Sequence, residues 1–199
     1  MDATTLLAAV MFVLVLPVAL LVWFVIREIR KTQTFFRALA SRFDGATRKI
    51  PFGVVFELEG IKVRIFALQG SIQYRARIRL HKDPGILVTR TFRKFKFLDA
   101  LHYSPSREQY FFHAPVDEQY GFRAKDARWM REIFNDELLD SMANNGRVMR
   151  IEIGRRGVRG SLLMITQSDD EHKKAQQAID ILNSMVAQVS HSTLAQLHR

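Results

Sequence analysis

The sequence predicts an α+β fold: an N-terminal transmembrane helix, then a mainly antiparallel, sandwich-like β-sheet domain covered by two helices. Two observations lead to this prediction. Residues 5–26 form an apolar run without one Lys, Arg, Asp, Glu or His. From Pro51 onward the apolar period changes from helical to two, and helical periods return in two later segments. The 199 residues therefore divide into a tail and transmembrane helix (1–26), a juxtamembrane amphipathic helix (27–45) and a cytoplasmic α+β domain (46–199).

The apolar run is long enough to anchor the chain in a membrane. At about 1.5 Å per helical residue it reaches about 33 Å, more than the bilayer core of about 30 Å. A cleavable signal peptide would need a basic segment before the run, but only residues 1–4 precede it. We therefore expect an uncleaved span, which Pro17 bends with or without a neighbouring helix. The residues assigned to the anchor are Leu6, Leu7, Val10, Phe12, Pro17, Leu21, Trp23 and Phe24.

Basic residues follow the span and none precedes it, which predicts the orientation. Lys and Arg beside a span stay on the cytoplasmic side. The membrane-flanking basic residues are Arg27, Arg30, Lys31 and Arg37. We expect a single-pass protein of a bacterial inner membrane, with its N-terminus outside and its C-terminal domain in the cytoplasm. The absence of cysteine fits a reducing compartment, as it fits many others.

The charge lies almost entirely in the expected cytoplasmic part. Residues 27–199 hold all 30 Lys and Arg and 19 of the 20 Asp and Glu, a formal net charge of +11. A cationic domain under an anionic leaflet is drawn to that leaflet. It is equally drawn to nucleic acid or to an acidic protein surface, so net charge alone does not choose among these partners.

An amphipathic helix is expected to continue from the span. Apolar residues recur at helical spacing at Phe35, Phe36, Leu39, Ala40 and Phe43, and Asp44-Gly45 is expected to end the helix. This apolar stripe could dock on a membrane partner. We favour the simpler interpretation, that it packs on its own domain.

Several segments alternate with the period of a β-strand. They are residues 52–58, 61–67, 72–80, 86–92, 92–98 and 109–113, with turns at Glu59-Gly60 and at Asp83 to Gly85. In the third segment, Ile72, Tyr74, Ala76, Ile78 and Leu80 share one face and Gln73, Arg75, Arg77 and Arg79 the other. This alternation predicts a strand with one buried face and one wet, positive face.

The arginines Arg75, Arg77 and Arg79 are the candidate interaction face. They could be an ordinary solvated face, or they could contact an anionic surface such as lipid headgroups. A nucleic-acid site is less expected, because the aromatic residues fall on the face predicted to be buried. No RNP-like, GxxG or zinc-knuckle pattern supports it either.

The second half predicts two helices and a hairpin. A helix from Asp126 to about Ala143 is stopped by residues 144–146. Segments 148–153 and 158–165 form a hairpin across Gly154 to Gly157. Residues 168–171 resemble a capping box, and the last helix carries its apolar side at Ala175, Ala178, Ile179, Leu182 and Met185.

No pattern predicts catalysis. The histidines His81, His102, His113, His172, His191 and His198 form no HxH or HExxH pair, and a zinc site without cysteine is not expected. Gly154, Gly157 and Gly160 suit a hairpin better than a phosphate loop, since a strand follows them. Acidic residues 169–171 suit a helix N-terminus better than a metal site. We expect no enzyme, no metal and no cofactor.

The stretch from Val116 to Met142, followed by "RIEI" and a terminal helix, resembles poorly characterised single-pass bacterial membrane proteins with a small cytoplasmic α+β domain of unknown function. Asp117, Tyr120, Phe122 and Asp126 carry the resemblance. It covers about the C-terminal 90 residues, and it implies neither an activity nor a catalytic residue.

The leading hypothesis is a non-catalytic, single-pass accessory or assembly subunit that stabilises a larger membrane complex, for example a respiratory or photosynthetic one. Its partners would be other membrane-protein subunits and membrane lipids. The alternative is a membrane-tethered domain that binds anionic lipid headgroups or nucleic acid.

Overall fold

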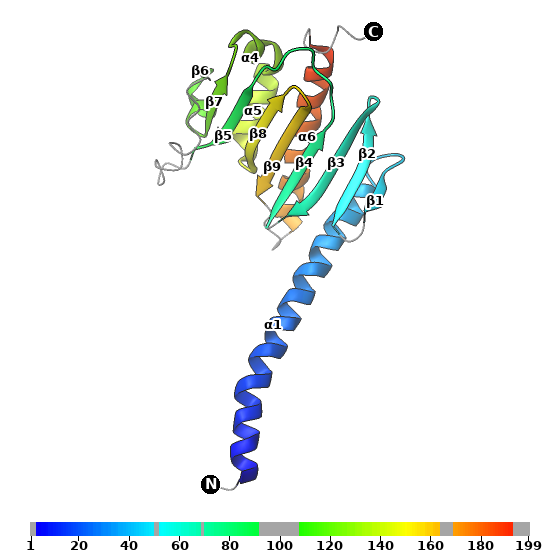
Figure 1. Ribbon diagram of the computed structural model, residues 1–199. Helices are drawn as coiled ribbons and strands as arrows, with labels where there is room; N and C mark the ends of the chain where they lie inside the picture. Colours follow the sequence, from blue (N-terminus) through cyan, green and yellow to red (C-terminus); the bar gives the residue numbers. More distant parts are fainter. Residues whose placement is uncertain (1–2, 50–51, 69, 92–107, 164–168, 193–199) are drawn as a thin grey trace.

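The computed structural model describes residues 3–49, 52–68, 70–91, 108–163 and 169–192 (Figure 1). The helices are α1 (Ala3–Ala40), α3 (Ala114–Asp117), α4 (Arg128–Ile133), α5 (Asp136–Asn145) and α6 (Asp169–His191). The strands are β1 (Thr47–Lys49), β2 (Gly53–Leu58), β3 (Ile61–Leu68), β4 (Ser71–Ala76), β5 (Ile86–Arg90), β6 (Glu108–Tyr110), β7 (Tyr120–Ala124), β8 (Val148–Gly154) and β9 (Gly157–Leu163). The fold is α+β, as predicted.

All nine described strands belong to one antiparallel sheet, in the order β1-β2-β3-β4-β9-β8-β5-β7-β6. The predicted hairpin of β8 and β9 is confirmed, and it lies between β4 and β5 rather than at an edge. Strands that are distant in the sequence are therefore neighbours in the middle of the sheet. The strand predicted over residues 92–98 lies outside the described residues.

One face of the sheet is covered by helices and carries the core (Figure 1). α6 lies close to β9: a Cβ atom at Gly160 would come within 2.7 Å of the Leu182 side chain, so glycine allows this approach. The Tyr74 hydroxyl on β4 donates a hydrogen bond to Asn183 Oδ1 on α6, at 2.8 Å. The predicted apolar side of the last helix is confirmed, since Ala175, Ala178, Ile179, Leu182 and Met185 are all buried.

The last turns of α1 belong to the domain. Phe36 and Leu39 are buried in the domain core, so the favoured interpretation of the apolar stripe is confirmed. The helix ends at Ala40, earlier than the predicted stop at Asp44-Gly45. After Ala40 the backbone tightens into turns, and the Phe43 ring stacks on Phe56 of β2 with a centroid distance of 3.9 Å. Phe43 thus stacks on the sheet instead of lying in a further turn of α1.

The prediction of one continuous helix from Asp126 to about Ala143 is wrong. Two separate helices, α4 and α5, form instead, because the helical conformation is interrupted between them. Phe134 has an extended conformation, with φ −102° and ψ 90°. Asn135 is the N-cap of α5, and its side-chain oxygen accepts a hydrogen bond from the Leu138 N–H at 2.9 Å. The predicted stop is confirmed: Gly146 has φ +63°, the left-handed conformation that ends many helices.

Other boundaries also differ from the prediction. β4 ends at Ala76 rather than at residue 80, although Ile78 and Leu80 remain buried. At this point the backbone leaves the ladder: the Leu80 N–H donates to the Arg155 carbonyl in the β8–β9 turn. β1, α3 and β7 were not predicted. The first residue of the predicted capping box, Ser168, lies outside the described residues.

Candidate functional site

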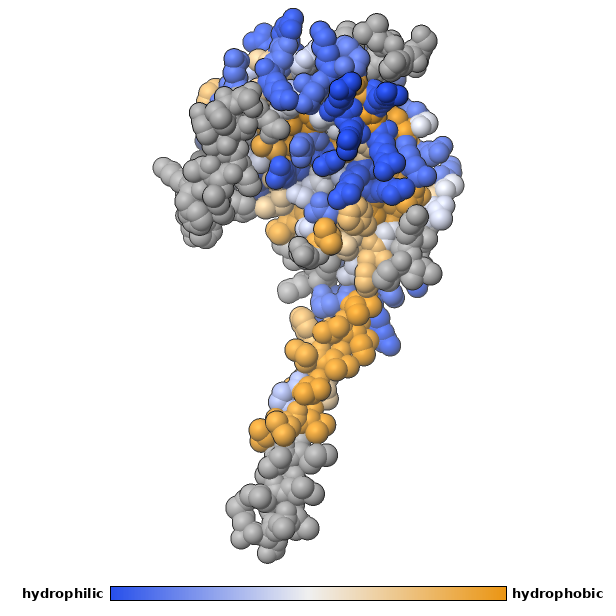
Figure 2. All heavy atoms as spheres, viewed as in Figure 1, coloured by the Kyte–Doolittle hydropathy of each residue, from blue (hydrophilic) through white to orange (hydrophobic). Residues whose placement is uncertain are grey.

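Within the described ranges no helix lies on the other face of the sheet, and this face is strongly cationic. Figure 2 shows the same side as Figure 1, and hydrophilic side chains gather over the middle of the sheet. The face is hollowed there by about 410 Å³. Of the residues that the structure describes, six basic side chains and no acidic ones line this hollow, which we call the basic hollow: Lys62, Arg64, Arg75, Arg77, Arg156 and Arg159.

Three of these arginines stand in one row across neighbouring strands. Arg75 on β4 is directly opposite Arg64 on β3 and directly opposite Arg159 on β9. Adjacent strands lie about 4.8 Å apart, so three positive side chains leave the sheet side by side. Like charges directly opposite one another on a sheet are destabilising. The row therefore has a folding cost, which an anion between the guanidinium groups would offset.

The surroundings of the row hold the arginines without neutralising them. The Arg75 guanidinium lies over the Phe66 ring, 5.0 Å from its centroid. The Arg64 Nε atom is buried and has no hydrogen-bond partner among the described residues. The next residue of the row, Glu152 on β8, is opposite Arg159 but lies 3.7 Å from Arg150, with which it forms an ion pair. No ion pair within the described part of the chain involves Arg64, Arg75 or Arg159.

The residues predicted to form an interaction face only partly coincide with the lining of the basic hollow. Arg75, Arg77 and Arg79 are all exposed, opposite the buried residues of the same segment, as the alternation predicts. Arg75 and Arg77 line the basic hollow, whereas Arg79 does not. The prediction missed the residues that other strands contribute. The sequence did contain a signal for Lys62 and Arg64, because they alternate with Val63 and Ile65, which are buried. Arg159 could be placed beside this group only once the order of the strands was known.

The residues predicted to form the anchor and its basic flank lie in α1. Among the described residues α1 is long and apolar enough to cross a membrane, and its side chains from Phe12 to Ile26 are exposed (Figure 2). The backbone of this helix includes the other predicted anchor residues, Leu6, Leu7, Val10, Pro17, Leu21, Trp23 and Phe24. Of the flanking residues, Arg27 lies over Trp23 at 5.3 Å and Lys31 pairs with Glu28 at 3.1 Å. Arg30 and Arg37 are exposed.

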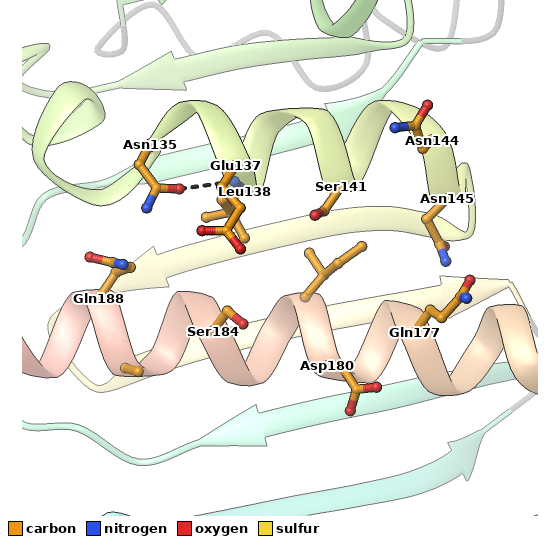
Figure 3. Close-up of a pocket in the computed structure, with 12 residues that line it drawn as sticks. Asn135, Glu137, Leu138, Ser141, Asn144, Asn145, Gln177, Asp180, Ser184 and Gln188 are labelled. Atoms are coloured by element: carbon orange, nitrogen blue, oxygen red, sulfur yellow. Dashed lines mark hydrogen bonds between the residues drawn. The ribbon is translucent and has the colours of Figure 1, made fainter.

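A second hollow, of about 620 Å³, lies between α5 and α6 on the helical side (Figure 3). Its lining is rich in amide side chains, but several of these stabilise the fold. Asn135 caps α5, and Asn145 donates to the Lys174 carbonyl and accepts from the Arg147 N–H. The Asp180 carboxylate pairs with Arg42 at 3.0 Å. This hollow is therefore a weaker candidate for a ligand site.

Acidic and histidine side chains do not gather into a metal centre within the described residues. No group of three or more His, Asp or Glu is placed to hold a metal ion there. At the start of α6, Asp170 pairs with Lys174 at 2.8 Å and Glu171 with Arg147 at 3.3 Å. Burial raises the pKa of Tyr74, and raises that of Tyr120 to about 12, so both phenols are core groups rather than acids.

Comparison with known proteins adds little to this description. No family model matches the chain, and no curated protein matches it in sequence. Among solved structures, the chain is similar to the crystal structure of the mycobacterial trehalose monomycolate transport factor A, TtfA. The TM-score is 0.46 at 9% sequence identity, over 79% of this chain and 95% of that one. A similarity of this size carries no inference about a ligand or a partner.

Proposed function

We propose that this protein is a non-catalytic, single-pass accessory subunit of a larger membrane complex. α1 holds it in a bacterial inner membrane, with the N-terminus outside and the domain in the cytoplasm. The open, basic face of the sheet contacts an acidic surface of another subunit. Residues 12–26 support the anchor, since they are apolar and exposed, and the same helix continues into the domain core through Phe36 and Leu39.

The observation that carries the docking role is the uncovered basic face. The central strands of a sheet are rigid, so cations on them are well placed to meet a complementary surface. Guanidinium groups do not give up protons in proteins, which makes this face suited to binding rather than to acid–base chemistry.

Purification of the tagged full-length protein in a mild non-ionic detergent tests the docking role. We expect proteins to co-purify in a fixed stoichiometry, and to be lost on raising the salt or on replacing Arg77 and Arg79 with Gln. Lys173→Gln, an exposed cation on α6 away from the open face, is the matched control. Co-purification of lipid or nucleic acid without protein would contradict the proposal.

The orientation has its own test. A reporter fused after residue 199 should be active in the cytoplasm, because the basic flank follows the span. In spheroplasts the domain should resist protease until the cells are lysed. Digestion from the periplasmic side would overturn the proposed orientation.

A further inference from the structure

We propose that the basic hollow is a binding site for a phosphate-type oxyanion, held by Arg64, Arg75 and Arg159. This goes beyond docking to a protein subunit and stands whether or not that docking occurs. The ligand class is a phosphate or diphosphate group, either on a soluble molecule or on a lipid headgroup.

The charge of the lining selects a multivalent anion. Six cations line the hollow. Glu57, across from Lys62, does not line it; Glu152, across from Arg159, lines a neighbouring hollow with Arg75 and Arg159 and pairs with Arg150. One carboxylate brings a single negative charge. A phosphate monoester brings about 1.5 to 2 negative charges and three acceptor oxygens, which match the forked donors of several arginines.

The geometry of the row is suited to one small anion. Three guanidinium groups rise from adjacent strands about 4.8 Å apart, so their donors can converge on the oxygens of one group. The Phe66 ring under Arg75 fixes one member of the row. The volume of about 410 Å³ falls in the usual range for small-ligand sites.

Arg64 supplies the most specific observation. Its Nε atom is buried and has no partner among the described residues, and a buried donor left unpaired is destabilising. Arg64 lines the hollow, so a small rotation of its guanidinium group would bring this donor to an oxyanion bound there. Nucleic acid is less suited to the site, since Phe66 is the one aromatic residue in the described lining and it already lies under Arg75.

Calorimetric titration of the full-length protein in a non-ionic detergent tests the site directly. Inorganic pyrophosphate and orthophosphate are the probes, and glutarate at equal ionic strength is the carboxylate control. We expect saturable binding of pyrophosphate at one site per chain, with weaker binding of glutarate. Arg64→Gln should weaken pyrophosphate binding about tenfold or more, whereas Lys173→Gln should change it less than about twofold.

Thermal unfolding separates a binding role from a structural one. Because Arg64→Gln removes like-charge repulsion, the ligand-free variant should melt at the same temperature as the parent protein or higher. If that variant does not fold, Arg159→Gln is titrated in its place, since Arg159 is exposed at the end of the row.

Nanodiscs separate the two sources of the phosphate group. A lipid headgroup predicts that phosphatidic acid in phosphatidylcholine nanodiscs competes with pyrophosphate, while phosphatidylcholine alone does not; a soluble ligand predicts no competition. Three results would disprove the site: no binding of pyrophosphate, an affinity for pyrophosphate no higher than that for glutarate, or an affinity for pyrophosphate that neither Arg64→Gln nor Arg159→Gln changes. Such a result would leave the protein co-purification of the proposed function intact.

Discussion

The two faces of the sheet are made by the same strands but have opposite chemistry. On β3, Val63 and Ile65 are fully buried in the core, while Arg64 between them belongs to the basic hollow. On β4, buried Tyr74 alternates with exposed Arg75. The covered face therefore supplies the stability of the domain, and the open face is free to carry charges that do not help folding.

The largest expected effect comes from the covered face. Ile65→Ala should lower the free energy of unfolding by about 2–5 kcal/mol, because it leaves a cavity in the core of the domain. Its neighbour Arg64, changed to Gln, is the matched control and should cost nothing. Chemical denaturation of the detergent-solubilised protein measures both. Similar losses for the two variants would show that the faces do not divide their roles in this way.

Replacing Arg75, Arg77 and Arg79 together with Gln tests the open face. Stability should change by no more than about 0.5 kcal/mol per site, as for ordinary surface substitutions. Retention in the complex should weaken by roughly 3 kcal/mol, at about 1 kcal/mol per arginine near an anionic surface. The remaining retention should depend less on salt, since screening acts over about 8 Å at physiological ionic strength. A large fall in the melting temperature of the triple variant would show that these arginines contribute to the stability of the fold.

A smaller effect is expected in the helical layer, at the cap of α5. Asn135→Ala should cost about 1 kcal/mol, because the Leu138 N–H loses its acceptor. Asn135→Ser, which keeps a capping oxygen, should recover most of the loss. Equal losses for the two variants would mean that Asn135 acts through another contact.

The smallest effect is expected at Asp83, beside the β8–β9 turn. A hydrogen bond from Lys125, at 2.6 Å, is the main cause that lowers the pKa of Asp83 below its ordinary value of 3.8. Because the folded pKa is the lower one, the stabilisation is present above pH 3.8 and is lost as the pH falls through the folded value. Both side chains are partly exposed, so Asp83→Asn should cost no more than about 1 kcal/mol at pH 7. The difference from the parent should disappear in strong acid. An undiminished difference there would exclude the charge as its cause.

Local patterns predicted much of the fold. Glu59-Gly60 between two alternating segments predicted the β2–β3 hairpin, and Asn144 to Gly146 predicted the end of α5. The break before α5 was missed because the apolar period continues across it through Ile133, Phe134 and Leu138. Asn135 followed by Asp136 and Glu137 is an N-cap signal that the period masked. β7 was missed because Gly121, a residue type depleted in strands, weakens the strand signal of its five residues.

The sequence by itself determined the apolar helix, the strand periodicity and which side chains of the third strand face water. These features depend on local sequence, since alternation sets the face of every residue in a strand. The basic hollow was decided only by the tertiary structure. It exists because the β8–β9 hairpin pairs with β4, which brings Arg159 beside Arg75 and Arg64. That pairing depends on the packing of non-local strands under α6, where Gly160 lies against Leu182. The alternation within one segment does not show which strand will be its neighbour in the sheet.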